Sequence, residues 1–318
     1  MEVDSTASSD DSKQQTRVVL WAVPRSISTA FFRAIMEGIG IKVLLEPFSN
    51  AYYFGHERVS KRYANEPCRD GCLFNDIKKQ YELPYEKYKS VFVKDMAYYL
   101  NTDVGNFEHL LPSGYVHTFL IRHPALSVAS LYKLSIDKDR TGWDWFNPDE
   151  AGFKELYQLF THITQDLGQK AIVVDSEDLI KSPRDTLVRY CQMTGLEFSE
   201  KMLSWKSIDF EIANYQVEEK RKAEEEEQQQ EEEEVEEEEQ PPISPGVAPK
   251  IFKGWQPWFE GVLSSTSFRE FDQQKIKKVV NTSVDPEIMA KINKMPPKVS
   301  QCVMECLPYY EKMRAYKI

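Results

Sequence analysis

The amino-acid sequence predicts an α/β fold, with a mostly parallel central β-sheet flanked by helices. Short runs of apolar residues recur along the chain, and segments with helical periodicity lie between most of them. Strands that are apolar at every position are typical of parallel sheets buried on both faces, and alternation with helices produces such sheets. The expected strands are residues 17–23, 42–45, 90–94, 116–121 and 171–174, and the clearest helical segments are 29–38, 126–134 and 153–167.

Most of the acidic charge lies in one segment. The chain has 318 residues and a formal net charge of −11, and residues 218–240 alone account for that charge with 14 Glu against 3 Lys or Arg. The remainder is nearly neutral, so no broad basic surface for nucleic acid is indicated. Any anion-binding site must therefore be local.

Composition divides the chain into four parts. We expect a disordered polar tail over residues 1–15 and an α/β core over 16–212. Residues 213–249 form an acidic low-complexity insertion, either disordered or a coiled coil, because like charges at this density repel one another. Residues 250–318 return to aromatic and apolar composition and complete the same domain.

Neither membrane insertion nor secretion is indicated. No apolar run reaches the ~18 residues that a membrane-spanning helix needs, and the polar, acidic start differs from a signal or transit peptide. We therefore expect a cytoplasmic protein with reduced thiols. Two CxxxC pairs, Cys68 with Cys72 and Cys302 with Cys306, would bind zinc only if the fold joined them. The alternative is that the first pair lies in a loop and the second on a helix, both as small apolar residues. We expect no metal.

A polar segment, Pro24-Arg25-Ser26-Ile27-Ser28-Thr29, joins the first expected strand to the first expected helix. Free backbone N–H groups and the helix dipole at such a junction attract phosphate, and Arg25 adds a charge-assisted hydrogen bond. The alternative is that Ser28 or Thr29 only caps the helix. No GxxxxGK[ST] sequence occurs in the chain, which argues against a common ATPase.

A second candidate site follows the strand expected at 116–121. Arg122 lies at its carboxyl end, where parallel α/β sheets bind ligands. Ser130 lies eight residues later, two turns into the next helix, so both side chains can converge on one phosphate. The alternative is a surface arginine and an ordinary helical serine.

Together these motifs resemble those of sulfotransferases that use 3′-phosphoadenosine 5′-phosphosulfate (PAPS). Residues 24–29 are similar to the family's loop for the 5′-phosphosulfate, and Arg122, Ser130 and Tyr132 are similar to its 3′-phosphate motif. Residues 171–187 resemble the family's strand that is followed by Glu-Asp-Leu and a helix starting at Pro. The resemblance covers residues 17–205 and resumes loosely over 244–268. It implies a single α/β domain of P-loop NTPase-like architecture.

The resemblance also implies how the donor is held. Arg25, Ser26, Ile27, Ser28 and Thr29 would bind its 5′ end, with Arg25 in place of the lysine that many members have. Arg122 and Ser130 would bind the 3′-phosphate. A basic loop with glycine, which many members place late in the chain, corresponds most closely to Lys250, Lys253 and Gly254, with Trp255 against the adenine. PAPS would be the donor, 3′-phosphoadenosine 5′-phosphate (PAP) the product, and a small-molecule hydroxyl or amine the acceptor.

The acceptor must lose a proton, and the residue that can accept it in this chain differs from that of the cytosolic members. Cytosolic members have Lys-Thr-His at the end of the third strand, whereas this chain has Lys94-Asp95-Met96. Another branch uses a Glu just after the second strand, where Glu46 lies here. We therefore expect Glu46 as the general base, Asp95 as the runner-up, and Lys94 beside the leaving phosphate. The alternatives are a helix-capping or salt-bridging Glu46 and a strand-end Lys94 that extends to solvent.

Three matters stay open from the sequence. Many members have Gly where this chain has Ile27, and a β-branched residue resists a positive φ, so the loop has either that strained geometry or a right-handed one. Aromatic segments at 51–54, 98–99 and 143–146 line an acceptor pocket or pack in the core. A catalytically silent relative that binds nucleotide or protein is the alternative function, and a nucleotide kinase is weaker because the Walker lysine is missing.

Overall fold

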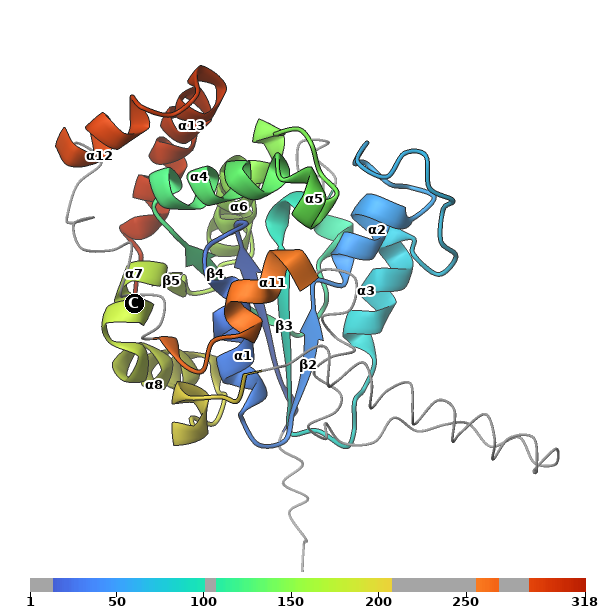
Figure 1. The fold of residues 1–318 in the computed structure, drawn as a ribbon. Coiled ribbons are helices and arrows are strands. Elements are labelled where there is room, and N and C mark those ends of the chain that lie inside the picture. The colour runs from blue at the N-terminus through green and yellow to red at the C-terminus, as the bar shows by residue number, and fades with distance from the viewer. Residues whose placement is uncertain (1–13, 101–106, 208–255, 269–285) are drawn as a thin grey trace, which may run out of the picture.

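The computed structural model describes residues 14–100, 107–207, 256–268 and 286–318, and Figure 1 shows their arrangement. Five strands form one sheet in the order β2-β3-β1-β4-β5, and every neighbouring pair is parallel. The predicted α/β fold with a parallel sheet is therefore confirmed. The strands are β1 (Thr16–Ala22), β2 (Ile41–Leu45), β3 (Ser90–Met96), β4 (Val116–Ile121) and β5 (Val173–Asp175).

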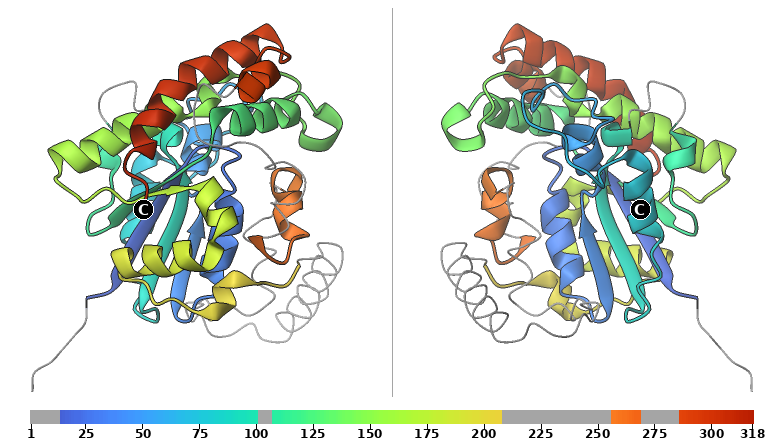
Figure 2. Two further views of the ribbon diagram at one scale, coloured as in Figure 1. Left: turned by 90° about the vertical axis from the view of Figure 1, so that its left-hand side faces the viewer. Right: turned by 90° about the vertical axis from the view of Figure 1, so that its right-hand side faces the viewer.

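Helices cover the sheet. Helix α1 packs on β2 and β3, whereas α13 packs on β4 and β5 and against α4 and α6, as two views in Figure 2 show. The α-helices are α1 (Ser28–Met36), α2 (Phe48–Phe54), α3 (Phe74–Glu82), α4 (Pro124–Ser135), α5 (Lys138–Thr141), α6 (Phe153–Thr161), α7 (Ser176–Lys181), α8 (Pro183–Thr194), α11 (Gln256–Leu263), α12 (Pro286–Ile292) and α13 (Pro297–Arg314). Shorter helical turns are η1 (Ala97–Leu100), η3 (Glu108–Leu110), η4 (Pro148–Ala151), η5 (His162–Asp166) and η6 (Glu200–Leu203).

The central strands are apolar because both of their faces are covered. All seven residues of β3 are buried, and so are the last five of β1. This burial explains the continuous apolar runs in the sequence, since a sheet with one wet face would alternate apolar and polar residues.

The parallel topology gathers the functional segments at one edge of the sheet. Residues 23–27 follow β1, Glu46 follows β2, and Arg122 follows β4. Register then sets their neighbours: Leu45 pairs with Lys94, and the Glu46 N–H donates to the Lys94 carbonyl at 2.7 Å. Segments far apart in the sequence therefore meet beyond the carboxyl ends of the strands.

Several sequence predictions lie outside the described residues. They are most of the expected N-terminal tail, the insertion at 213–249, and Lys250, Lys253, Gly254 and Trp255. Within the described ranges, no helix is long and apolar enough to cross a membrane.

The structure places the cysteines as one helical pair and one loop pair. Cys302 and Cys306 are buried one turn apart on α13, whereas Cys68 and Cys72 lie half-buried in the loop between α2 and α3. Over the part of the chain that the structure describes, no group of three or more His, Cys, Asp or Glu is placed to hold a metal ion. The two pairs are thus not joined in one site.

Candidate active site

The loop after β1 enters helix α1 through a strained conformation. Ile27 is the N-cap residue, with φ 62° and ψ 17°, and Arg25 also has a positive φ, of 64°. A left-handed conformation at a β-branched residue costs about 1–3 kcal/mol, and such strain collects at functional sites. Of the two geometries that the sequence left open for Ile27, the structure has the strained one.

That conformation forms a concavity of backbone N–H groups. A left-handed residue followed by right-handed helical residues turns successive backbone N–H groups toward one point, here those of Ile27, Ser28 and Thr29. No described side chain caps this helix. The capping role that Ser28 or Thr29 could have had is therefore not observed, and the first N–H groups of α1 stay available to a ligand.

Ser26 stabilises the loop from its buried side. Its side chain is fully buried, and its hydroxyl donates to the Val23 carbonyl at 2.7 Å. The buried Ser176 hydroxyl lies 2.6 Å from the Ser26 carbonyl and 2.8 Å from the Ile121 carbonyl, so it ties the loop to the end of β4. Ser26 and Ser176 thus support the site and do not line its cavity.

Two arginines, Arg25 and Arg122, converge on the loop after β1. Arg25 Nε donates to Ser130 Oγ at 3.2 Å, Arg25 Nη1 donates to the Trp258 carbonyl at 2.6 Å, and Arg122 Nη1 donates to the Arg25 carbonyl at 2.7 Å. Arg25, Arg122 and Ser130 all line one cavity. The second motif is therefore not an isolated surface arginine.

The charged guanidinium groups of Arg25 and Arg122 lie in a poorly solvated environment. Burial lowers the pKa of Arg25 to about 10, with smaller contributions from the charges of Arg122 and Arg140. Burial likewise lowers the pKa of Arg122 to about 10. Neither guanidinium forms an ion pair with any described carboxylate. A bound anion would therefore relieve both the desolvation and the repulsion between them.

Glu46 is fixed at the end of β2 by two donors. Lys94 Nζ hydrogen-bonds to Glu46 Oε1, and the Tyr99 hydroxyl donates to Oε2 at 2.9 Å. Lys94 is fully buried, so it does not extend to solvent. Glu46 forms a salt bridge, as one alternative expected, yet its carboxylate also lines the cavity.

Asp95, the second candidate for a base, lies on the other side of β3. Successive residues of a strand point to opposite faces, so Asp95 points away from Lys94, and neither of the two lines the cavity. Asp95 Oδ2 accepts from the Tyr81 hydroxyl at 2.7 Å and from the Phe48 N–H at 2.9 Å, and Oδ1 accepts from the Met96 N–H at 2.8 Å. Burial raises its pKa to about 7. Asp95 therefore stabilises the start of α2, and it does not line the cavity.

The cavity has a volume of about 390 Å³ and a mixed lining. Its charged and hydroxyl lining residues are Arg25, Ser28, Thr29, Glu46, Arg122, Ser130 and Glu150. Its aromatic lining residues are Tyr53, Tyr98, Tyr99, Trp143, Trp258 and Phe259. Each aromatic segment that the sequence offered as a pocket lining thus contributes at least one ring.

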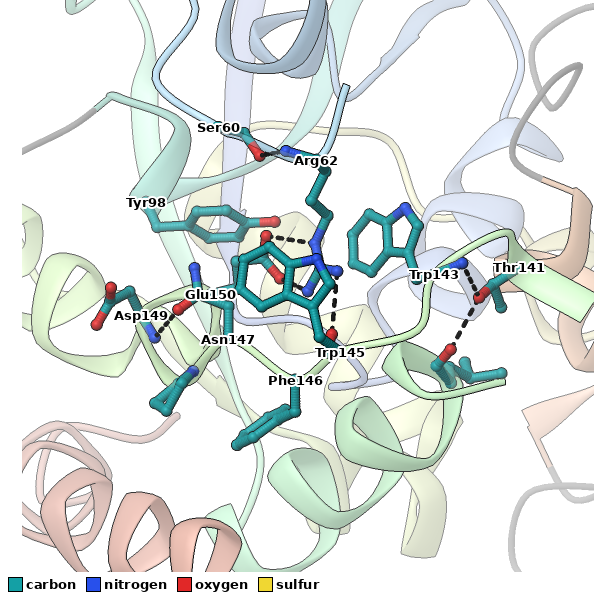
Figure 3. A network of polar contacts seen from close by, with 12 residues as sticks. Ser60, Arg62, Tyr98, Thr141, Trp143, Trp145, Phe146, Asn147, Asp149 and Glu150 are labelled. Atoms are coloured by element: carbon teal, nitrogen blue, oxygen red, sulfur yellow. Dashed lines mark hydrogen bonds and ion pairs between the residues drawn. The ribbon is translucent and has the colours of Figure 1, made fainter. Parts of the chain in front are cut away.

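A buried ion pair that the sequence did not reveal supports the aromatic wall. Arg62 Nε and Nη2 donate to the two oxygens of Glu150 at 2.7 and 2.5 Å, and both side chains are almost fully buried. Figure 3 shows the Arg62 side chain beside the indole rings of Trp143 and Trp145. The guanidinium lies 3.4 Å from the ring centroid of Trp143 and 4.5 Å from that of Trp145. Arg62 and Glu150 are 88 residues apart, so no local pattern could have paired them.

The chain matches the model of a sulfotransferase domain family over residues 16–214. This match covers more than half of the chain, which therefore belongs to that family of sulfotransferases. The same region resembles two Arabidopsis thaliana proteins, branched-chain-amino-acid aminotransferase-like proteins 2 and 1, which are 25% and 24% identical over 199 residues. The matches cover 59% of this chain, which spans only 31% of each relative.

Solved sulfotransferase structures resemble the chain at low sequence identity. The sulfotransferase domain from the curacin biosynthetic pathway is 15% identical, with a TM-score of 0.38 over 60% of this chain and 77% of that one. The domain from the Synechococcus PCC 7002 olefin synthase is 16% identical, with a TM-score of 0.40 over 63% and 80%.

Proposed function

We propose that this sulfotransferase moves a sulfuryl group from PAPS to a hydroxyl or amine of a small-molecule acceptor. One observation carries the proposal. Arg25 and Arg122 are poorly solvated, form no ion pair within 4.0 Å of a described carboxylate, and converge on the start of α1, where backbone N–H groups can bind an anion. A nucleotide with phosphates at two positions would satisfy both arginines, and PAPS has phosphates at its 5′ and 3′ ends.

In this proposal each group has a separate task. The N–H groups at residues 27–29 and Arg25 hold the 5′-phosphosulfate, while Arg122 and Ser130 hold the 3′-phosphate. Lys250, Lys253, Gly254 and Trp255 would complete the nucleotide site. The aromatic part of the cavity takes the acceptor, next to the phosphosulfate and Glu46.

The reaction is an in-line displacement at sulfur. The acceptor oxygen or nitrogen forms a bond to sulfur as the bond between sulfur and the 5′-phosphate oxygen breaks. Glu46 accepts the acceptor's proton, and the electron pair leaves with the phosphate as PAP forms. Arg25 stabilises the charge that develops on the departing oxygen, while Lys94 holds the Glu46 carboxylate.

Label transfer tests this function. The full chain is incubated with ³⁵S-labelled PAPS and a panel of hydroxyl and amine acceptors, with PAP binding measured in parallel. Transfer should fall at least about 100-fold in Glu46→Gln, since a positioned general base contributes 10²–10⁴-fold, while PAP still binds. Glu66→Gln, the same change at an exposed residue, is the control. Binding of PAP without transfer would identify a silent relative, and preference for ATP with Mg²⁺ would refute the proposal.

A further inference from the structure

We propose that Tyr99 is a positioning residue that fixes the orientation of the Glu46 carboxylate for proton transfer. This inference rests on the proposed function, in which Glu46 is the general base. It concerns a residue that sequence patterns placed only in the pocket lining or the core.

The two oxygens of Glu46 have separate donors. Lys94 bonds to Oε1, whereas the Tyr99 hydroxyl bonds to Oε2 at 2.9 Å. A carboxylate held at one oxygen can still rotate about its terminal bond, but a second donor on the other oxygen stops that rotation. Each carboxylate oxygen has two lone pairs, so both oxygens keep an acceptor site after binding these donors.

The backbone alone leaves this carboxylate poorly defined. Glu46 follows the last residue of β2 and has a positive φ of 48°. Its side chain is 14% exposed and faces the cavity, so packing encloses it only in part. Its orientation therefore depends on the two hydrogen bonds more than on neighbouring apolar groups.

Tyr99 is itself held rigidly. It lies in η1, directly after β3, and its side chain is buried. Its ring packs against those of Tyr52, Tyr53 and Tyr98, with centroids 5.2, 5.7 and 4.4 Å away. Burial raises the pKa of Tyr99 well above its ordinary value, so the hydroxyl keeps its proton and stays a donor. A hydroxyl fixed in this way can orient its partner at little entropic cost.

The test compares two buried tyrosines, of which only Tyr99 bonds to Glu46 and lines the cavity. Tyr99→Phe removes the hydroxyl on Glu46 and keeps the packed ring. Tyr52→Phe is the matched control, because Tyr52 is buried beside Tyr99 but neither lines the cavity nor bonds to Glu46. Tyr99→Phe should lower kcat about 10- to 100-fold, as expected for loss of a supporting hydrogen bond, and leave the Kd for PAP within about twofold. Tyr52→Phe should keep kcat near that of the unmodified chain.

A double variant shows whether Tyr99 acts through Glu46. Adding Tyr99→Phe to Glu46→Gln should lower the remaining activity by less than about threefold, because the carboxylate to be positioned is already gone. A full additional loss, or equal effects of Tyr99→Phe and Tyr52→Phe, would overturn the positioning role. If the unmodified chain transfers no label from PAPS, the proposed function and this inference both fail. If the unmodified chain transfers label and Tyr99→Phe has the same kcat, only the inference about Tyr99 fails.

Discussion

Replacing Glu150 by Gln should strongly destabilise the chain, because it leaves the Arg62 charge buried without its partner. The side chains of the pair are only 1% and 2% exposed, and Arg62 is enclosed between two indole rings. Removing one partner of a buried ion pair costs about 3–5 kcal/mol. Since Trp143 and Trp145 still stabilise the Arg62 cation, we expect a loss of stability at the lower end of this range, about 3 kcal/mol. That loss corresponds to a fall in Tm of roughly 6–12 °C.

The complementary change, Arg62→Met, should depend differently on pH. It leaves a buried carboxylate, and burial raises the pKa of Glu150 above its ordinary value. Below that raised pKa the carboxyl takes up a proton and the penalty disappears, so the cost of Arg62→Met should shrink as pH falls toward about 5. Glu150→Gln removes the titrating carboxyl itself, so the stability of this variant should not share that dependence on pH.

Urea denaturation of both variants between pH 5 and pH 8 gives the two free energies of unfolding. The double variant Arg62→Met/Glu150→Leu should recover much of the loss, because apolar residues of similar volume replace buried ion pairs well. A cost for Glu150→Gln below about 1 kcal/mol, or the same pH dependence for both single variants, would refute the claim that this pair is desolvated.

Two further predictions concern the supports of the site. The raised pKa of Asp95, about 7 against 3.8, means that the native chain binds a proton more tightly than the unfolded one. The free energy of unfolding of the unmodified chain should therefore fall by roughly 4 kcal/mol as pH rises from about 4 to 7. That of Asp95→Asn should not. Urea denaturation that gives both chains the same slope of unfolding free energy against pH would disprove this. Ser176→Ala should weaken PAP binding about threefold to tenfold by freeing the loop before α1, at a cost of about 1 kcal/mol. Unchanged PAP affinity in calorimetry would contradict that coupling.

Much of the fold was predictable because burial on both faces leaves a clear pattern. The apolar runs identified all five strands of the sheet, each to within a few residues. The rule that ligands bind at the carboxyl ends of parallel strands directed attention to Arg122, and the structure places it against the loop that contains Arg25. This argument needs only chain direction and sheet order, not atomic detail.

The parts of the site that were not predictable depend on register and on long-range packing. Strand alternation could have separated Lys94 from Asp95, but only the pairing of β2 with β3 brings Lys94 to Glu46. The left-handed conformation of Ile27 runs against its residue type, because the surrounding structure imposes it. The pairing of Arg62 with Glu150 joins a loop to the short helix η4, and no sequence signal marks it.

The central claim is that two phosphates of one nucleotide meet Arg25 and Arg122. Calorimetric titration of the unmodified chain and of Arg122→Ala, with PAP and with its analogue lacking the 3′-phosphate, tests it most directly. A charge-assisted hydrogen bond contributes about 1.5–3 kcal/mol, so Arg122→Ala should weaken PAP binding roughly 10- to 150-fold. Binding of the analogue should change less than about threefold. Equal losses for both nucleotides would contradict the assignment of the 3′-phosphate to Arg122 and, with it, the proposed PAPS site.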